Sequence, residues 1–468
     1  MEKLKALTPL DGRYGEITKP LAEIFSEYSL IKNRIKIEVE YLIFLSEFGS
    51  SKIIRKLKNE EKIFLRNIYK NFLLKDAQKI KIIERKTKHD IKAIELYLRN
   101  LLDRNKLKDI SQFIHFGLTS DDINNVAYSL MIKEALESVL IPRLKELLKI
   151  LAELSIEYKN LPLLARTHGQ PASPTTLGKE FSVFLERLGN EETKLLSKKL
   201  PGKITGATGN FNTYYISFPN IDWLKFSREF IKKFGLEPKL VTTQVVPHED
   251  VSEILQNFIR INNIILELDV DIWLYISYGY FHQRLEKQQV GSSTMPHKVN
   301  PIDFENSEGN LKVANSLLWM LSNELQISRL QRDLSGSTIR RNYGTSLGYC
   351  LIGYKSTIEG LRKITPNIDR IRRDLEENAQ VVAEAFQIIL RKHGYHDAYE
   401  RIAELSRGQT FSVDEICILI EKLKIPQGIK KEFKKIVPWT YLGVAEKLAI
   451  SIAKKWLKFL DERSINGF

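Results

Sequence analysis

The amino-acid sequence predicts a protein built mainly from α-helices, some of them long enough to form the centre of a bundle. The segment 251–278 contains neither proline nor glycine, and its apolar side chains occur around most of the helix circumference. Strand-like alternation of apolar and polar residues is scarce. Apolar residues at helical spacing occur elsewhere too, for example at Leu144, Leu147, Leu148, Leu151 and Leu154. A long helix that is apolar on most sides is typical of the middle of a bundle, which neighbouring subunits would complete.

Two breaks in the helical pattern divide the sequence into three predicted domains. One is the loop-rich region from Asn105 to Ser120, and the other is Thr365-Pro366-Asn367. We expect a mostly helical N-terminal domain at residues 1–113, a central long-helix domain at 114–363 and a helical C-terminal domain at 364–468.

Two helix starts are predicted from capping signals in the central domain. Ser173-Pro174 and Asn300-Pro301 each place a capping side chain before a proline at the first helical position. A helix N-terminus carries unpaired N–H groups that attract anions. Polar segments beside these two helix starts are therefore candidates for binding an anionic ligand.

Composition limits the class of protein. With 468 residues, 43% of them hydrophobic, the chain can bury a large core. The two cysteines, Cys350 and Cys417, show no CxxC spacing, so we expect thiols in a reducing compartment. The N-terminus lacks a continuous apolar stretch, and no later segment offers the ~20 apolar residues of a membrane span. These features predict a cytoplasmic protein without a membrane partner.

The net charge of +14, from 72 basic and 58 acidic residues, has three interpretations. It fits a nucleic-acid surface, an anionic substrate, or a surface that is simply rich in lysine. Lys145-Glu146-Leu147-Leu148-Lys149 is typical of a solvated helix face. No zinc-finger, RRM-like or basic-zipper pattern accompanies the charge, so we expect no nucleic-acid partner.

Polar clusters that interrupt the helices are the candidates for chemistry. Arg166-Thr167-His168-Gly169-Gln170-Pro171 places a histidine, whose unperturbed pKa suits proton transfer near neutral pH, among hydrogen-bonding residues. A lone loop histidine is more often structural. The preceding arginine and the nearby predicted helix start favour a functional role.

A second cluster is the segment Gly291-Ser292-Ser293-Thr294-Met295-Pro296-His297-Lys298-Val299-Asn300-Pro301. Its dense donors and the helix start that follows predict an anion site. Serine is a poor base, so a catalytic serine here needs the surrounding amides and Lys298 to lower its pKa. The alternative is an ordinary surface loop.

A third cluster, residues 331–342, holds three arginines, three hydroxyl side chains and a glycine. Arginine with serine or threonine is typical of phosphate binding, because the guanidinium fork matches two phosphate oxygens. Weaker clusters occur at 11–14, 87–90 and 115–120. No HExxH or paired histidine and carboxylate spacing occurs, so we predict neither a metal nor an organic cofactor.

The segment 291–301 resembles the signature of the fumarase/aspartase superfamily. Within that superfamily, His297 after Met-Pro is similar to the adenylosuccinate lyases and to related lactonising enzymes rather than to fumarases. Further similarity to bacterial adenylosuccinate lyases runs in order along the chain, at Asp11-Gly12-Arg13-Tyr14, His89-Asp90, residues 115–120, Arg332, Ser337, Arg341 and Pro438-Trp439-Thr440-Tyr441-Leu442-Gly443.

The resemblance implies an all-α, fumarase/aspartase-like fold whose long-helix bundle is completed in a homotetramer, with active sites shared between subunits. It implies a purine nucleotide substrate and a β-elimination that releases fumarate. The implied reactions convert adenylosuccinate to AMP and succinylaminoimidazole carboxamide ribotide to AICAR. We expect no cofactor.

The resemblance also implies residue roles. Ser292 corresponds to the base and His168 to the general acid, with Glu305 placed to polarise the imidazole. Lys298 and Asn300 would hold the succinyl carboxylates and stabilise the aci-carboxylate. The substrate-binding residues implied in this way are Arg13, Tyr14, Thr87, Lys88, His89, Asp90, His115, Thr119, Ser120, Gln244, Ser293, Asn300, Asn306, Arg332, Ser337 and Arg341.

Two other functions stay open at the level of sequence. One is another superfamily lyase of the fumarase or argininosuccinate lyase type, against which the arginine cluster at 331–342 argues. The other is a basic helical nucleic-acid-binding protein, for which only the net charge argues.

Overall fold

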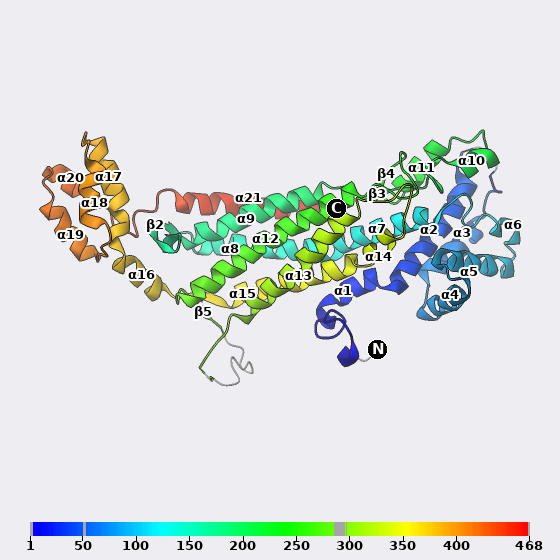
Figure 1. Cartoon of the computed structure of the whole chain (residues 1–468), viewed down its shortest axis with the longest axis horizontal. Coiled ribbons are helices and arrows are strands. Elements are labelled where there is room, and N and C mark those ends of the chain that lie inside the picture. Colours follow the sequence, from blue (N-terminus) through cyan, green and yellow to red (C-terminus); the bar gives the residue numbers. More distant parts are fainter. Residues whose placement is uncertain (1–2, 50–52, 285–294, 296, 467–468) are drawn as a thin grey trace. The chain divides into compact units, whose positions relative to one another are not determined.

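The computed structural model of the chain describes residues 3–49, 53–284, 295 and 297–466. The protein is built mainly from helices (Figure 1), so the predicted all-α class is confirmed. The strands among these residues are short and form three two-stranded sheets. No described helix combines the length and the hydropathy that crossing a membrane requires.

The elements follow one another along the chain in three stretches. The first contains η1 (Lys3–Lys5), α1 (Gly15–Phe25), α2 (Glu27–Glu47), α3 (Asn59–Lys70), α4 (Leu74–Thr87), α5 (Asp90–Arg104), α6 (Lys108–Ser111), α7 (Ser120–Ala135), η2 (Leu136–Leu140) and α8 (Ile141–Glu157). The second contains β1 (Pro162–Thr167), β2 (Gln170–Thr176), α9 (Leu177–Leu196), β3 (Pro201–Gly202), α10 (Asn212–Ser217), α11 (Trp223–Lys232), β4 (Glu237–Pro238), α12 (Glu249–Ser277) and β5 (Phe281–Gln283). The third contains α13 (Ile302–Glu324), α14 (Ser335–Arg340), α15 (Tyr343–Lys363), β6 (Ile364–Pro366), α16 (Ile368–Glu377), η3 (Ala379–Val382), α17 (Ala383–Lys392), α18 (Ala398–Ser406), α19 (Val413–Lys422), α20 (Gln427–Phe433) and α21 (Ala445–Asn466).

The chain forms two compact units. The first unit consists of Met1–Arg143, Thr193–Asn262 and Asn310–Ile352. The second unit consists of Leu144–Glu192, Asn263–Gly309 and Gly353–Phe468. The predicted division into three domains stays a prediction.

Helix α12 confirms the long helix expected at 251–278, because it runs for 29 residues from Glu249 to Ser277. Its apolar side chains are buried on several faces, as expected for a bundle helix. Ile254, Leu255, Phe258, Ile261, Ile265, Leu268 and Ile272 are all almost inaccessible to solvent.

The core of the first unit packs around α2. This helix contacts α3, α5 and α7, and its face toward α11 is aromatic. Tyr41 and Phe44 on α2 lie 4.9 to 5.7 Å, between ring centroids, from Phe226 and Phe230 on α11. Edge-on and tilted aromatic pairs of this kind add to the free energy gained by burying the rings.

A buried ion pair holds the start of α7 in this unit. Asp122 lies 2.9 Å from the Lys203 ammonium group, and both side chains are fully buried. The same carboxylate accepts hydrogen bonds from the backbone N–H groups of Thr119, Thr205 and Gly206. Removing either charge would leave the other buried and uncompensated. The carboxylate therefore fixes the backbone at Thr119, the residue before Ser120.

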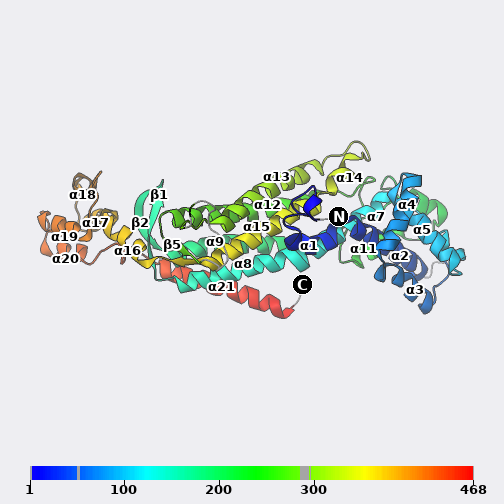
Figure 2. The same ribbon diagram turned by 90° about the horizontal axis from the view of Figure 1, so that it is seen from below.

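In the second unit, strands β1 and β2 form an antiparallel hairpin next to α16 (Figure 2). Its register runs from Pro162 opposite Thr176 to Thr167 opposite Gln170, with an irregularity after Leu163. The predicted helix start at Ser173-Pro174 is wrong, because both residues belong to β2 and α9 begins at Leu177. Pro174 sits where the register shifts, a position at which its missing N–H costs the ladder nothing.

The other predicted helix start is close to the observed one. Helix α13 begins at Ile302, one residue after Pro301. It lies against α15 closely enough that a Cβ atom on Gly360 would stand 2.7 Å from the Phe304 ring. Such a distance is too short for any larger residue.

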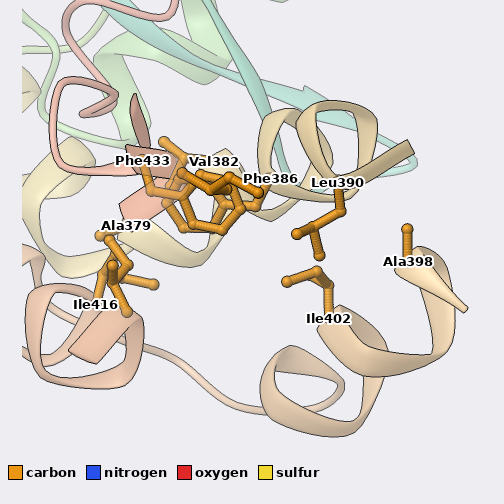
Figure 3. Close-up of a cluster of buried hydrophobic side chains, with 10 residues drawn as sticks. Ala379, Val382, Phe386, Leu390, Ala398, Ile402, Ile416 and Phe433 are labelled. Carbon is orange, nitrogen blue, oxygen red and sulfur yellow. The ribbon is translucent and has the colours of Figure 1, made fainter. Parts of the chain in front are cut away.

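The C-terminal helices α17 to α20 enclose a separate hydrophobic cluster, drawn in Figure 3. The Phe386 and Phe433 rings stack at its centre, with 4.3 Å between centroids and 7° between planes. Val382, Leu390, Ile402 and Ile420 surround them.

Candidate active site

The first unit contains a cavity of about 420 Å³ that gathers charged and hydroxyl side chains. Seven of the residues predicted from sequence line it, namely Lys88, His89, Asp90, Ser120, Arg332, Ser337 and Arg341. Four of them lie between residues 88 and 120, and the other three lie between residues 332 and 341, more than 200 residues further along the chain. The cavity is lined more by cations than by anions, which suits an anionic ligand.

One wall of the cavity is the turn between α4 and α5. Lys88 takes the left-handed conformation, with a φ of 54°, and ends α4. His89 then caps α5, because its Nδ1 accepts a hydrogen bond of 3.1 Å from the backbone N–H of Lys92. The turn therefore places a lysine and a histidine side by side at the cavity.

Arg34 of α2 binds side chains from two other helices that line the cavity, Asp90 of α5 and Asn124 of α7. Its Nη2 lies 2.8 Å from Asp90 Oδ2, and its Nε donates a hydrogen bond of 2.8 Å to Asn124. Burial raises the pKa of Asp90, but the charge of Arg34, together with hydrogen bonds from the Ile91 N–H and from Arg34, lowers the pKa overall. Asp90 is therefore a carboxylate at neutral pH, and it neutralises Arg34.

The opposite wall is the segment around α14. Arg332 donates from Nη1 to Gln244 Oε1 over 2.8 Å and from Nη2 to Ser337 Oγ over 3.3 Å. Gln244 is thus joined to the cavity through Arg332. The guanidinium is held in one orientation, as bidentate recognition of a phosphate requires.

Arg340 lines the cavity and is buried, as Arg34 is. Its Nη2 lies 2.7 Å from Asp121 Oδ1, with both side chains almost fully buried. His248 is also buried near this pair. Burial, together with the positive charge of Arg340, lowers the pKa of His248 to about 4. His248 is therefore neutral at physiological pH.

Sequence reasoning missed six residues of the cavity. They are Arg34, Glu84, Asn124, Tyr128, Leu334 and Arg340. Arg340 stands within the predicted arginine cluster, so its charge was visible in the sequence. The other polar residues lie inside helices, where a polar side chain on its own does not indicate which partner it faces.

Other predicted residues of this unit lie outside the lining of the cavity. His115 has a φ of 61°, and its Nδ1 lies 2.6 Å from Glu38 Oε1. Burial lowers the pKa of His115, but the Glu38 carboxylate outweighs burial and raises it. Thr87 donates a hydrogen bond to the carbonyl of His89. Arg13 lies over the ring of Tyr14, 5.9 Å from its centroid, ahead of α1.

The second unit contains His168, at the tip of the β1–β2 hairpin. His168 and Gly169 form a two-residue turn in which both have positive φ, 52° and 74°. Such a turn matches the twist of a hairpin, and glycine tolerates it best. The imidazole is exposed to solvent. The side chain predicted to act as acid is therefore accessible.

Four more of the predicted residues lie in the second unit, namely Lys298, Asn300, Glu305 and Asn306. Asn306 donates a hydrogen bond of 2.7 Å to Ser356, and Glu305 accepts one of 3.1 Å from Trp273. The predicted action of Glu305 on His168 stays a prediction. Ser292 and Ser293 lie outside the described part of the chain.

Lys298 and Asn300 lie on either side of Val299, the residue at which the signature segment, residues 291–301, is hydrogen-bonded to β5. Gln283 Nε2 donates a hydrogen bond of 3.3 Å to the carbonyl of Val299, between the two predicted carboxylate-binding residues. Lys298 is exposed to solvent. Strand β5 thereby holds this part of the signature segment.

Comparison with known proteins assigns the chain to a family. Residues 12–315 match the family model described as "Lyase", and residues 328–442 match the one described as "Adenylosuccinate lyase C-terminal". Adenylosuccinate lyase from Haemophilus influenzae is 44% identical over 96% of this chain and 98% of that protein. This chain belongs to the adenylosuccinate lyase family. It is a carbon–nitrogen lyase.

Two further adenylosuccinate lyases are also similar to this chain over nearly its whole length. The enzyme from Dictyostelium discoideum is 46% identical over 95% of this chain and 97% of its own length. The enzyme from Escherichia coli K12 is 40% identical, over 95% and 98%. The predicted membership of the fumarase/aspartase superfamily is confirmed.

Solved structures with the same fold have other activities in their names. A fumarate lyase from Mesorhizobium sp. BNC1 matches with a TM-score of 0.76 at 18% identity, over 93% of this chain and 97% of that one. A 3-carboxy-cis,cis-muconate lactonizing enzyme from Pseudomonas putida matches with a TM-score of 0.74 at 17% identity, over 94% and 97%. At these identities the likeness confirms the fold alone.

Proposed function

We propose that this chain is an adenylosuccinate lyase that eliminates fumarate from adenylosuccinate, giving AMP, and from succinylaminoimidazole carboxamide ribotide, giving AICAR. The main observation in support is the cavity that Lys88, Arg332, Ser337 and Arg341 line together. Both substrates carry a phosphate monoester, whereas malate and argininosuccinate carry none. Guanidinium and hydroxyl groups in this arrangement recognise a phosphate.

The proposed elimination has three parts. Ser292 takes a proton from the succinyl carbon next to the carboxylate, and the electron pair of that C–H bond delocalises into the carboxylate. The C–N bond then breaks as the Cα–Cβ double bond of fumarate forms. His168 donates a proton to the departing nitrogen.

The remaining predicted residues hold the substrate. Lys298 and Asn300 bind the succinyl carboxylates and stabilise the charge that builds up on the aci-carboxylate, with Ser293 and Asn306 beside them. Arg13, Tyr14, Thr87, His89, Thr119, Ser120 and Gln244 contribute to nucleotide binding, and His115 supports them. Glu305 polarises the imidazole of His168.

We further propose a homotetramer whose active sites are shared between subunits. Large apolar side chains are exposed on α12, at Val270 and Trp273, and on α13, at Val313 and Trp319. Trp319 has 63% of its surface exposed, which is unusual for tryptophan in a lone chain. A cytoplasmic location fits the two cysteines, neither of which forms a disulfide.

The assignment is tested by incubating the purified protein with adenylosuccinate and following the change in purine absorbance and the release of fumarate. Malate and argininosuccinate serve as parallel substrates. We expect turnover of adenylosuccinate alone among the three. Turnover of malate or argininosuccinate without turnover of adenylosuccinate would overturn the proposal.

Shared active sites are tested separately. His168→Ala and Ser292→Ala proteins, each inactive alone, are mixed under conditions in which subunits exchange. Recovery of activity supports shared sites, since some sites then receive both intact residues. No recovery despite proven exchange contradicts sharing.

A further inference from the structure

Asp374 on α16 is a buried carboxylate that joins two segments of the second unit carrying predicted catalytic residues. Its side chain is 5% exposed. One oxygen, Oδ2, accepts hydrogen bonds from both Arg166 Nη2, over 2.6 Å, and the Tyr280 hydroxyl. Asn378 Nδ2 lies 3.4 Å from the other oxygen.

We propose that Asp374 is a positioning residue for the elimination, holding the His168 hairpin and strand β5 against α16. This inference rests on the proposed function and names a residue that acts through others. In this role Asp374 acts through Arg166 and Tyr280, whose side chains donate hydrogen bonds to it.

The first link runs through Arg166. This residue lies on β1, two positions before His168, and its guanidinium is bound on two sides. Asp374 accepts its hydrogen bond, and the Tyr278 ring lies beneath it with 5.1 Å between the guanidinium carbon and the ring centroid. Because the tip of the hairpin is exposed, its orientation depends on anchors of this kind at its base.

The second link runs through Tyr280, which immediately precedes β5. The Asn367 N–H donates a hydrogen bond of 2.8 Å to the Tyr280 carbonyl. Strand β5 pairs with β6, and its Gln283 holds Val299 between Lys298 and Asn300. A shift of Tyr280 would therefore move the carboxylate-binding side chains.

The two links meet at one oxygen atom, so they are coupled. A hydroxyl and a guanidinium that share an acceptor fix their parent strands relative to the same helix. Displacing a catalytic group by about 1 Å costs about 100-fold in rate. The positioning role therefore predicts a loss in kcat, while a purely structural role predicts a loss in stability alone.

The test replaces the carboxylate by an amide of the same shape, Asp374→Asn. We expect kcat to fall by about 10- to 100-fold while KM changes less than about threefold, and the pH dependence of kcat to change because His168 is no longer held. The matched control is Asp369→Asn, which makes the same substitution at an exposed position of the same helix. The control should keep the wild-type kcat.

A second variant keeps the test decisive if Asp374→Asn does not fold. Tyr280→Phe removes only the hydroxyl and leaves the Arg166–Asp374 ion pair intact. We expect a smaller fall in kcat, of about 3- to 30-fold. In the double variant the two losses should not multiply, because both act through one oxygen.

Folded variants with kcat within twofold of the wild-type value would overturn the proposal, as would a change confined to the thermal unfolding midpoint. Failure of the proposed function is distinguishable, because in that case the wild-type protein itself would not convert adenylosuccinate. The variants are compared only against a wild-type protein that does.

Discussion

The cavity of the first unit and the hairpin of the second unit are built in opposite ways. In the cavity, carboxylates compensate the buried cations, as in the pairs Arg34–Asp90 and Arg340–Asp121. In the hairpin, the imidazole of His168, the proposed general acid, is exposed, and an ion pair joins Arg166, two residues earlier, to the buried carboxylate of Asp374. Recognising a phosphate requires a rigid array of donors, whereas proton transfer requires an accessible group on a fixed support. Binding and turnover should therefore respond to different substitutions.

The largest effect is expected at the hairpin. His168→Ala should lower kcat by roughly 100- to 10,000-fold with little change in KM, as expected when a general acid is lost. Ser292→Ala should have an effect of similar size, since it removes the proposed base. Steady-state kinetics with adenylosuccinate provide the measurement.

The control for this comparison is His396→Ala, which removes an exposed histidine of the C-terminal helical region. It should leave kcat unchanged. Near-normal turnover in the His168 variant would mean that another group donates the proton.

A second effect concerns His248, which is buried near the Arg340–Asp121 ion pair. The pKa of His248 is about 4 in the folded protein, against an ordinary 6.5. Between these values the unfolded chain binds the proton more readily. The contribution of His248 to stability is therefore fully present above pH 6.5 and is lost progressively as the pH falls from 6.5 to 4, by on the order of 3 kcal/mol in total.

Urea unfolding at pH 7.5 and 4.5 measures this loss. The His248→Gln variant should lose less free energy of unfolding on acidification than the wild-type protein. His396→Gln, at an exposed site, should behave like the wild-type protein. Equal acid sensitivity in all three proteins would show that His248 does not stay neutral in the folded state.

A third effect separates binding from turnover. Arg332→Ala should raise KM for adenylosuccinate by about 10- to 100-fold while kcat changes little, because a charge-assisted hydrogen bond to phosphate is lost. The variant should also lose any preference for the nucleotide over its nucleoside. Arg228→Ala, an exposed arginine of the same unit, is the control. A fall in kcat without a rise in KM would place Arg332 in the chemistry instead.

The smallest expected effect is a fall in KM, opposite in sign to the rise in KM expected for Arg332→Ala. Glu84 is an acidic residue lining the cavity and forms an ion pair with Lys81, over 2.8 Å. Glu84→Gln removes a negative charge near the proposed phosphate and should lower KM by about two- to fivefold, less at high salt. Glu27→Gln is matched, because Glu27 binds the same lysine but does not line the cavity. Equal KM values in both variants would contradict the placement of the phosphate.

The difference between the two regions also explains what the sequence could predict. Lys88 and His89 lie in the turn between α4 and α5, and Arg332 lies in the loop before α14, so each belongs to a short polar cluster that is visible in the sequence. Arg34 lies inside α2, where its side chain resembles any other polar residue of a helix until α5 and α7 pack against it.

The hairpin is even harder to predict from sequence than the position of Arg34. Ser173-Pro174 looks like a helix start when read alone, and only its pairing with β1 makes it a strand. Asp374 is 208 residues from Arg166, and no local pattern connects them. The sequence thus predicts the residues that line the cavity better than those that hold neighbouring segments in place.

The left-handed backbone at Lys88, His115 and His168 has a consequence for engineering. All three have positive φ, between 52° and 61°, which costs a side chain other than glycine roughly 1–2 kcal/mol. A redesign that optimised thermostability alone would choose glycine or asparagine at each of these positions. It would thereby delete one ammonium group and two imidazoles from the enzyme, so these three positions should be held constant in any such redesign.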